Sequence, residues 1–571
     1  MTKNKSPYGE KIRIEGDRKV AIETSRNRII LIGALFSVAF IFISGRVVDI
    51  SIFSEETEPR LTHSVSKDGK SSGRADITDR NGVLLATSLT TASLYAHPRN
   101  IIDPEQTAIR LSRALPRLDA KKIENKLRSD ANFVWLYRHL TPRKHHAIHR
   151  LGIPALEFQR ESRRMYPVGP LASHVLGYTD LDSKGLAGIE RYFDKTLRTS
   201  QKSIALSIDV RVQHMLEHEL RIGKKTFRAS GAAGLVMDVN SGEVLAMASL
   251  PSYNPNHHRK ISLPQRFNRA TLGVYEMGST FKIFTTAMAL ELGIVTLSDG
   301  YDCTNPIKVS RFSIRDYHAK KRWLSVKEIF IHSSNIGSAK MALAVGVQQH
   351  QKFLMKLGLL KPIKIELFET AKPLSPSPWR KINSMTIAYG HGMAVSPLHL
   401  AAGVAAIVNG GIYHPPTLVQ RKDKQQFAGR RVISEETSQT MRHLLWQAVE
   451  NGTGRRAAVP GFLIGGKTGT AEKSSKKGYH RKSLISSFVA AFPMNKPKFV
   501  ILVMLDEAKG TKKTSGSATG GRIAAPIVRS VVQRIAPILG LQPTKSKQSY
   551  QRAVTASVTH LSKKERWIVT H

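Results

Sequence analysis

Residues 234–249 read GLVMDVNSGEVLAMAS, in which two apolar runs flank the turn-forming residues NSG at 240–242. Apolar runs on either side of such a turn predict a β-hairpin. A second stretch, 486–507, reads SSFVAAFPMNKPKFVILVMLDE and predicts another hairpin that turns near Asn495. Because helical segments separate the two hairpins, we expect an antiparallel sheet flanked by helices, which is an α+β fold.

The domain that carries these hairpins is predicted to span residues 206–541. It opens with SIDVRVQHMLEHELR, whose apolar spacing is that of a capped amphipathic helix. Upstream, the stretch from Arg74 reads RADITDRNGVLLATSLTTASLYAHP and places an Asn-Gly turn between two strand-like runs, whereas 103–150 look helical and basic. Residues 46–205 are therefore expected to form a β-containing, non-catalytic domain, and 542–571 a loosely ordered basic tail.

The N-terminus carries the pattern of a membrane anchor. Residues 29–45 read IILIGALFSVAFIFISG, contain no charge and are just long enough to span a bilayer. Eight lysines and arginines precede this run, whereas four acidic residues follow it between Asp49 and Glu58. The positive-inside rule then places the basic arm 1–28 in the cytoplasm and the rest outside. A cleaved signal peptide and a buried core helix are the alternatives.

Composition limits the partners. The 571 residues include 87 Lys and Arg against 43 Asp and Glu, a net charge of +44 that favours polyanions. Export makes nucleic acid an unexpected partner, so we expect cell-wall polymer and anionic membrane surface instead. Cys303 is the only cysteine, which excludes an intrachain disulfide, a cysteine-based zinc site and an iron–sulfur cluster.

The segment 278–293, GSTFKIFTTAMALELG, carries the first candidate chemistry. Ser279 and Lys282 stand three residues apart, on one face at the start of a predicted apolar helix. The positive helix end and burial would both lower the pKa of Lys282, so that it could take the Ser279 proton. Backbone N–H groups there could bind an oxyanion. Alone, the pattern is weak, because a serine at this position is more often an ordinary N-cap.

Two further motifs strengthen the interpretation. Residues 332–335 read HSSN at the start of another small-residue helix, and 467–470 read KTGT after an apolar run. Ser333 could relay a proton to a leaving amine, and the Asn335 amide could hold a substrate amide. Lys467, Thr468 and Thr470 could bind a carboxylate, while Gly469 would let a substrate backbone lie along the strand. Three such motifs in this order are specific to serine acyl transfer.

Several other patterns carry a less specific signal. GFLIGGKT at 461–468 has the spacing of a phosphate-binding loop, but apolar bulk fills the loop and export removes ATP. His145 and His149 could bind a metal, although the basic residues around them favour a solvated face. His391, between two glycines, could line the cleft but is more typical of a turn. The run 473–482 is more typical of a solvated loop than of a glycan contact.

With the three motifs in place, the sequence resembles the penicilloyl-serine transferases, and over residues 74–540 it looks like a class B penicillin-binding protein. The resemblance extends to the pedestal, in RADITDRNGVLLA, MYPVGPLASHVLGY and GLAGIERYFDKTL. In the catalytic half, FNRATLGVYEMGSTFK, AYGHGMAVSPLHLA, GGKTGTAEK and GGRIAAPIV are similar to the division-specific branch, penicillin-binding protein 3. Ser334 stands where β-lactamases of this superfamily have an Asp, which makes a β-lactamase less expected.

The resemblance implies a transmembrane anchor, a pedestal domain and a transpeptidase domain with a five-stranded antiparallel sheet flanked by helices. It implies a septal D,D-transpeptidase in which Ser279 is the nucleophile, Lys282 the base and Ser333 the relay. Asn335, Lys467, Thr468, Gly469 and Thr470 would bind substrate. Neither a metal nor an organic cofactor is expected. The implied partners are peptidoglycan stem peptides, β-lactams and a polytopic lipid-II polymerase of the division machinery.

Two other functions are compatible with the same motifs. An elongation-specific transpeptidase shares all three, and only the residues around them favour division. A membrane-anchored penicillin sensor would need the acylation chemistry alone. A cytoplasmic arm of 28 residues leaves no room for an effector domain, so we expect an enzyme.

Overall fold

A computed structural model describes residues 17–48, 73–200, 202–309, 312–421, 429–475 and 478–543. The chain divides into two compact units, Met1–Ser71 and Ser72–His571. In the first unit, helix α1 (Asp17–Val48) contains a 19-residue apolar stretch, Arg26–Ser44, that is long enough to cross a membrane. The predicted anchor therefore lies within a longer helix. Residues 1–16 of the predicted arm, and 544–571 of the predicted tail, lie outside the described residues.

The second unit contains a five-stranded antiparallel sheet with the strand order β16-β17-β18-β8-β9. Both predicted hairpins are confirmed, because 234–249 lies within β8 and β9, and 486–507 lies within β17 and β18. Edge strand β16 pairs with β17 in a register that places Lys467 opposite Val489 and Thr470 opposite Ser486. The strands span Gly231–Asp238 (β8), Val244–Leu250 (β9), Gly465–Ser475 (β16), Gly478–Phe492 (β17) and Phe499–Asp506 (β18).

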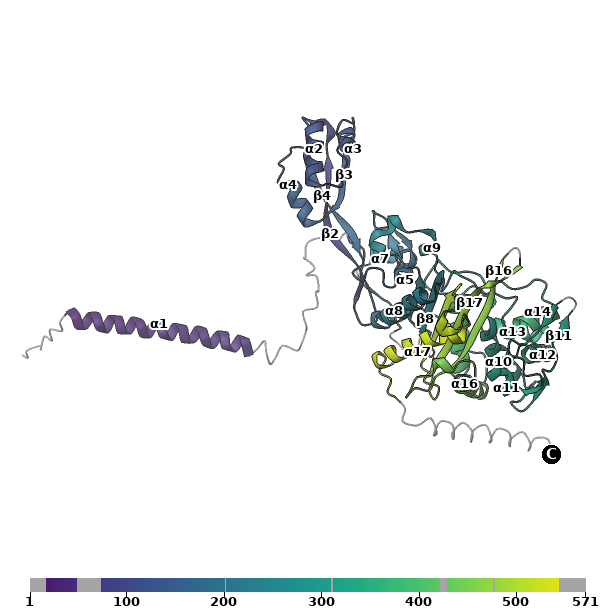
Figure 1. Ribbon diagram of the computed structural model, residues 1–571. Coiled ribbons are helices and arrows are strands. Elements are labelled where there is room, and N and C mark those ends of the chain that lie inside the picture. The colour runs from purple at the N-terminus through teal and green to yellow at the C-terminus, as the bar shows by residue number, and fades with distance from the viewer. Residues whose placement is uncertain are drawn as a thin grey trace, which may run out of the picture. The chain divides into compact units, whose positions relative to one another are not determined.

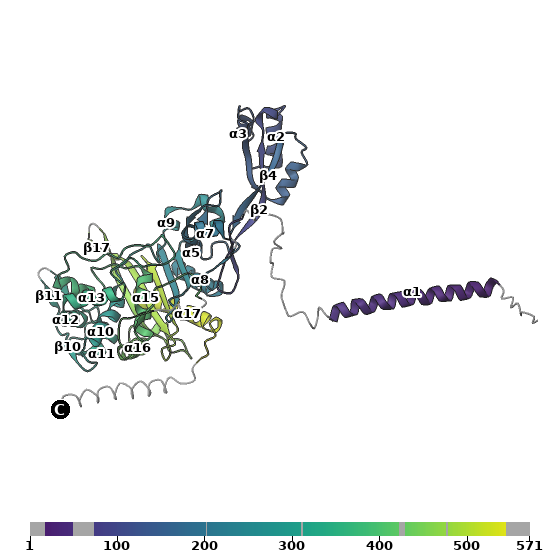
Figure 2. The same ribbon diagram turned by 180° about the vertical axis from the view of Figure 1, so that it is seen from behind.

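Helices cover both faces of this sheet, with α17 on one face and α15 on the other (Figures 1 and 2). Alternate residues of each strand enter opposite cores, as the two-residue period of a strand requires. Val236 and Ile501 pack with α8 (Val210–Thr226) and α17 (Gly520–Ile538), whereas Leu235 and Leu502 belong to the core that includes α10 (Lys282–Glu291) and α15 (Pro397–Val408). The predicted helix at 207–221 is confirmed, and the Asp209 side chain caps it.

The remaining elements of this domain complete the catalytic half of the chain. They are α9 (Leu263–Arg266), β10 (Gly300–Asp302), β11 (Ile307–Val309), β12 (Phe312–Ile314), β13 (Trp323–Ser325), α11 (Val326–His332), α12 (Asn335–Val345), α13 (Val347–Lys356), α14 (Lys381–Ile387), β14 (Ile412–Tyr413), β15 (Arg430–Arg431) and α16 (Glu435–Glu450).

The N-terminal part of the second unit is built on a separate sheet, in which β2 pairs with β1, β3 and β4. The predicted turn between two strands is confirmed, with Gly82 at a φ of +86° between β1 and β2. Helices α2, α3 and α4 lie beside β2, β3 and β4 in Figure 1 and share a small core with them. The elements are β1 (Ile77–Thr78), β2 (Leu84–Ala96), α2 (Pro104–Ala114), α3 (Ala120–Leu127), β3 (Val134–Leu140), α4 (Pro142–His149), β4 (Leu156–Met165) and β7 (Ile204–Ala205).

The sequence interpretation of 103–150 as helical was wrong in one place. Strand β3 lies between α3 and α4, and it pairs with β2 through contacts such as Tyr95 with Trp135. Aromatic and β-branched residues are over-represented in strands, and 134–137 read VWLY. This short strand was missed because the basic residues on both sides of it belong to a helical pattern.

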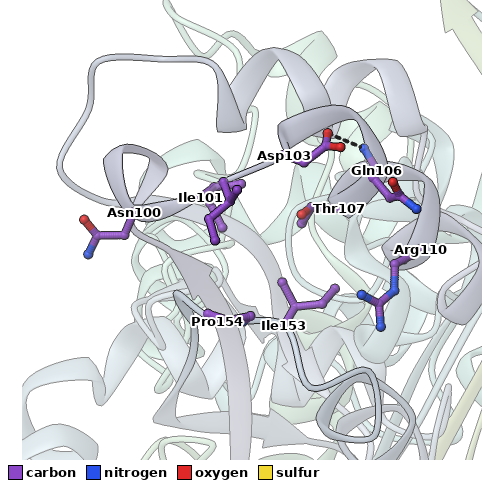
Figure 3. Close-up of a pocket in the computed structure, with 9 residues that line it drawn as sticks. Asn100, Ile101, Asp103, Gln106, Thr107, Arg110, Ile153 and Pro154 are labelled. Atoms are coloured by element: carbon purple, nitrogen blue, oxygen red, sulfur yellow. Dashed lines mark hydrogen bonds between the residues drawn. The ribbon is translucent and has the colours of Figure 1, made fainter.

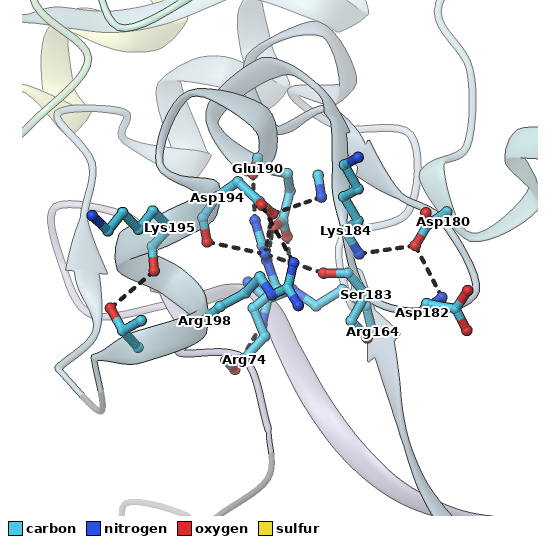
Figure 4. Close-up of polar contacts among 12 residues, drawn as sticks. Arg74, Arg164, Asp180, Asp182, Ser183, Lys184, Glu190, Asp194, Lys195 and Arg198 are labelled. Carbon is cyan, nitrogen blue, oxygen red and sulfur yellow. Dashed lines mark hydrogen bonds and ion pairs between the residues drawn. The ribbon is translucent and has the colours of Figure 1, made fainter.

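Buried charges join the beginning of this part to its end (Figure 4). The Glu190 carboxylate accepts from Arg74 Nε at 2.5 Å and from Arg164 Nε at 2.7 Å, and all three side chains are almost fully buried. Arg74 also contacts Asp194 at 2.6 Å. The network thus ties the chain before β1 to β4 and to two short helices. The two helices are α6 (Gly188–Tyr192), which carries Glu190, and α7 (Asp194–Thr199), and they follow α5 (Ser173–Leu176), β5 (Tyr178–Thr179) and β6 (Gly185–Ala187).

A small cavity of about 210 Å³ lies between α2 and the chain at 153–154 (Figure 3). Two of the polar side chains around it bond within the fold. Asp103 caps α2 by accepting from the N–H of Gln106 at 2.9 Å, and Arg110 donates to the Leu151 carbonyl at 2.6 Å. None of the predicted site residues lines it, so we assign it no function.

Candidate active site

Ser279 lies in a 3₁₀ turn, Gly278–Phe281, that leads directly into α10. The predicted helix therefore begins with a 3₁₀ turn. Among the described residues, no side chain caps this turn or α10. Gly278 has a φ of +55°, and a Cβ there would lie 2.5 Å from the Thr470 carbonyl oxygen. Glycine is thus required both for the backbone conformation and for the close approach of the serine turn to β16.

Lys282 is buried, with 1% of its surface exposed, and its amine contacts four oxygen atoms of three residues. Its Nζ lies 3.1 Å from Ser279 Oγ and 3.0 Å from Ser333 Oγ. It also lies 2.6 Å from the Ser333 carbonyl oxygen and 2.7 Å from Asn335 Oδ1. The structure therefore brings together the first two predicted motifs around one amine.

Burial lowers the pKa of Lys282 well below its ordinary value, because a low-dielectric surrounding disfavours the charged form. The nearby charge of Lys467 lowers it further, and the Asp316 carboxylate acts in the opposite direction. A lysine with a lowered pKa can hold its nitrogen lone pair at neutral pH. The geometry and the charge state therefore both suit proton abstraction from Ser279.

The turn Ser333–Asn335 connects α11 to α12. Ser333 adopts the left-handed conformation, with a φ of +62°, and ends α11. Ser334 begins α12, where its hydroxyl accepts from the N–H of Gly337 at 3.0 Å. This reversal between two helices points the hydroxyl of Ser333 and the amide of Asn335 toward Lys282.

Lys467 reaches the same serine from the sheet. Its side chain is fully buried, and its Nζ lies 2.8 Å from Ser333 Oγ. Burial lowers the pKa of Lys467 to about 7. Ser333 thus lies between the two amines of Lys282 and Lys467, and its hydroxyl can pass a proton.

The residues after Lys467 hold the edge of the sheet against the serine turn. A Cβ on Gly469 would lie 2.5 Å from the Met277 carbonyl oxygen, so a side chain there would push the two segments apart. Thr470 Oγ1 accepts from the N–H of Gly520 at 3.0 Å, which leaves its own hydroxyl proton available to a ligand. Thr468 Oγ1 lies 2.9 Å from Thr453 Oγ1.

Beyond Thr470 a cavity of about 370 Å³ extends along β16, and it was not predicted. Glu276 lines it and accepts from the N–H of Gly392 at 2.8 Å. Lys473 lines it as well, and pairs with Asp506 at 2.9 Å. Glu276 precedes Ser279 by three residues, so its position beside this motif could have indicated that it lines the site.

His391 lies between Gly390 and Gly392, at φ values of +86° and +80°, in a turn beside Tyr389. A Cβ on Gly390 would lie 1.9 Å from the Gly278 carbonyl oxygen, so this turn packs directly on the serine turn. Burial, with the charge of Lys282, lowers the pKa of His391 to about 4. His391 is therefore a turn residue that also faces the site.

The rejected patterns have structural roles. Gly465 to Thr468 lie in strand β16 rather than in a phosphate-binding loop. The rings of His145 and His149 pack around Phe158, and no cluster of three potential metal ligands occurs in the part of the chain that the structure describes. The run 473–482 continues β16 and β17 as paired strands around residues 476–477, which are not described, so the expectation of a loop was wrong.

Comparisons with known proteins agree with this geometry. Residues 232–533 match the penicillin binding protein transpeptidase domain, and residues 70–221 match the penicillin-binding protein dimerisation domain. The chain is 41% identical, over 91% of its length and 90% of the relative's, to the probable peptidoglycan D,D-transpeptidase FtsI of Caulobacter vibrioides. It is 31% identical, over 83% of its length and 85% of the relative's, to the probable peptidoglycan D,D-transpeptidase PenA of Neisseria meningitidis.

Among solved structures, penicillin-binding protein 3 of Mycobacterium tuberculosis in complex with aztreonam superimposes with a TM-score of 0.66. The two chains share 22% sequence identity over 83% of this chain and 97% of that one, a likeness that concerns the fold. The chain belongs to the penicillin-binding protein family, as a class B transpeptidase of the division-specific, penicillin-binding protein 3 type.

Proposed function

We propose that the chain cross-links peptidoglycan stem peptides at the division septum through an acyl-enzyme on Ser279. The observation that carries this proposal is the convergence of Ser279, Lys282 and Ser333, with Lys282 Nζ within 3.1 Å of both hydroxyl oxygens. A buried amine between two hydroxyls suits proton transfer in both directions. The reaction class is serine-type D,D-transpeptidation.

Acylation begins when Ser279 Oγ attacks the carbonyl carbon between the last two D-alanines of a donor peptide. Lys282 takes the hydroxyl proton as the C–O bond forms. Backbone N–H groups of Ser279 and Thr470 stabilise the oxyanion, because Gly278 brings the two segments together. When the C–N bond breaks, Ser333 gives its proton to the departing D-alanine amine and recovers one from Lys282.

Deacylation reverses these transfers with a different amine. An amine of a neighbouring stem peptide attacks the ester carbonyl and loses a proton to Lys282. The ester C–O bond then breaks, and Ser279 regains its proton. The product is a new amide cross-link. A β-lactam mimics the donor peptide and acylates Ser279, which makes the enzyme a β-lactam target.

The other motif residues are proposed to bind the donor. Lys467, with the hydroxyls of Thr468 and Thr470, binds the terminal carboxylate by charge-assisted hydrogen bonds. Asn335 holds a donor amide, and Gly469 lets the donor backbone lie beside β16. Residues 467–470 lie on edge strand β16, along which an extended peptide can be bound.

We propose a single-pass inner-membrane topology for the chain. Residues 1–28 are cytoplasmic, 29–45 form the anchor, and the rest lies in the periplasm at the septum. The apolar stretch of α1 and its basic flank support this topology. We also propose boundaries at 46–205 for the pedestal, 206–541 for the transpeptidase domain and 542–571 for the tail. A polytopic lipid-II polymerase of the division machinery is the proposed partner.

The decisive experiment separates an enzyme from a penicillin sensor. The full chain in detergent is given a fluorescent penicillin, and separately a D-Ala-type thioester donor with a D-amino acid acceptor. We expect covalent labelling and acyl transfer, both abolished by Ser279→Ala and both slowed by several orders of magnitude by Lys282→Ala. Depletion in cells should produce filaments that fail to divide. Labelling without donor turnover, together with normal division on depletion, would establish the sensor instead.

A further inference from the structure

Asp316 is a carboxylate that neither the motifs nor their spacing indicated, and it contacts the serine-asparagine turn directly. It lies two residues after β12, in the connection to β13, and is half-buried. Its Oδ1 accepts from the N–H of Asn335 at 2.5 Å and from the N–H of Ile336 at 3.0 Å. Its Oδ2 accepts from Ser334 Oγ at 2.7 Å. Both carboxylate oxygens are therefore used on the first residues of α12.

The residue before Asp316 fixes the Asn335 side chain. The Arg315 carbonyl oxygen accepts from Asn335 Nδ2 at 2.9 Å. Because the amide nitrogen is held there, Oδ1 of Asn335 faces Lys282 Nζ at 2.7 Å. The short segment Arg315–Asp316 thus determines both the backbone position and the amide orientation of Asn335.

The turn is held between the Lys282 amine and the Asp316 carboxylate. On one side Lys282 Nζ contacts the Ser333 carbonyl oxygen, Ser333 Oγ and Asn335 Oδ1. On the other side Asp316 binds the N–H groups and the hydroxyl at the start of α12, where the helix dipole favours a negative charge. A loss of either contact would let the relay hydroxyl move away from the amine.

We propose that Asp316 is a positioning residue of the transpeptidation reaction. It holds the Ser333–Asn335 turn within hydrogen-bonding distance of Lys282. The proposal rests on the function proposed above for Lys282 and Ser333. Asp316 does not touch the reacting atoms. It acts through Asn335 and Ser334, and through its charge on the base.

The charge of Asp316 gives a readout that a purely structural contact would not change. The charges of Lys467 from β16 and of Asp316 both act on Lys282, and the titratable ring of His391, from the turn after α14, lies near it. His391 is neutral near pH 7 because burial lowers its pKa to about 4, and Lys467 lowers the pKa of Lys282. Asp316 raises the pKa of Lys282, so its neutralisation would lower that pKa further.

The test measures the acylation rate constant of the full chain in detergent between pH 5.5 and 9.5. The methyl ester of a penicillin serves as the acylating compound, because it carries no carboxylate for Lys467. Acylation needs neutral Lys282, so the rate rises with pH through the pKa of Lys282. Asp316→Asn removes the charge at constant shape, Asp316→Glu keeps it, and Asp302→Asn neutralises an exposed acid of the same domain as a control.

We expect Asp316→Asn to lower the plateau rate by about 10- to 100-fold, the range for loss of charge-assisted hydrogen bonds. The acidic limb of its pH–rate profile, along which the acylation rate rises with pH, should move to lower pH. Asp316→Glu should restore the limb to the wild-type position and recover part of the rate, and Asp302→Asn should leave rate and limb unchanged.

Two results would overturn the inference. One is a wild-type rate and limb in Asp316→Asn. The other is an equal rate loss in Asp316→Asn and Asp316→Glu, with unmoved limbs and melting temperatures that fall together, which is the behaviour of a structural tie. Ser279→Ala is included to distinguish a failure of the proposed function from a failure of the role proposed for Asp316. If Ser279→Ala is still acylated, the proposed function itself fails. If acylation depends on Ser279 but Asp316→Asn leaves it unchanged, only the positioning role is refuted.

Discussion

Lys467→Met removes one charge from the site while keeping most of the volume of the side chain. Lys467 is fully buried between Ser333, whose Oγ lies 2.8 Å from its Nζ, and the Phe330 ring. Methionine is unbranched and adapts to a confined space, so the site should keep its shape. The change therefore tests whether the amine binds the carboxylate of the donor or only fills the core.

The expected loss follows from one charge-assisted hydrogen bond. Such a bond contributes about 1.5 to 3 kcal/mol, which is about 10- to 150-fold in the acylation rate if the contact persists in the transition state. The empty enzyme holds Lys467 at a pKa of about 7, so its charge is lost as the pH rises above that value. The preference for a carboxylate-bearing compound should therefore decrease with increasing pH.

The assay compares a penicillin with its own methyl ester, by stopped-flow acylation of the full chain from pH 6 to 9. In the wild type, the ratio of the two rate constants should fall with pH. In Lys467→Met it should be small and independent of pH, because only the free acid loses its partner. An equal loss for acid and ester, with the pH dependence of the ratio retained, would refute carboxylate binding and leave Lys467 with a structural role.

Three further results are expected. Protease added to spheroplasts should remove the mass beyond residue 46, and full protection would contradict the topology. Glu190→Gln removes the counter-charge of the buried Arg164 guanidinium and leaves Arg74 only its contact with Asp194, so it should lower the free energy of unfolding by about 3 to 5 kcal/mol in denaturant titration; a change below 1 kcal/mol would show that water reaches the network. Lys467 has a lower pKa in the folded state than in the unfolded state, so the unfolded chain binds more protons between about pH 7 and 10, and stability should rise with pH across that window by up to about 5 kcal/mol. Lys467→Met should lack this rise in thermal melts, and an identical slope in both proteins would place the titration elsewhere.

The elements that could be predicted are those whose signals are local. The hairpins at 234–249 and 486–507 each combine an apolar run with an adjacent turn, and Gly242 in the predicted turn has a φ of +78°. The capped helix predicted within 207–221 begins directly after Asp209, whose side chain caps it. Strand β3 was missed because it is seven residues long and lies between two basic helices, and its pairing with β2 is not a local property.

The same distinction applies to the site. Ser279 and Lys282 are three residues apart, so their proximity follows from a single turn, and the contact of Lys282 with Ser333 was expected only from the resemblance. The close approach of Gly278 to Thr470 depends on where the serine turn meets the edge of the sheet. No spacing along the chain contains that information, because the two segments belong to different elements.

Asp316 shows what lies beyond motif reasoning. An aspartate after a short strand is usually a solvated turn residue, and nothing in the sequence of 312–323 indicates otherwise. Its role arises because the β12–β13 connection passes beside the start of α12, where three donors converge on one carboxylate. In the proposed mechanism the three motifs provide the nucleophile, the base, the relay and the carboxylate site, and each of them works only at a fixed distance from the others. That distance is set by close backbone approaches at Gly278, Gly390 and Gly469, and by the hydrogen bonds of Asp316 to the Ser333–Asn335 turn. Substitutions at these four positions should therefore impair acylation more than their lack of reactive groups suggests, because they move the reacting atoms relative to one another.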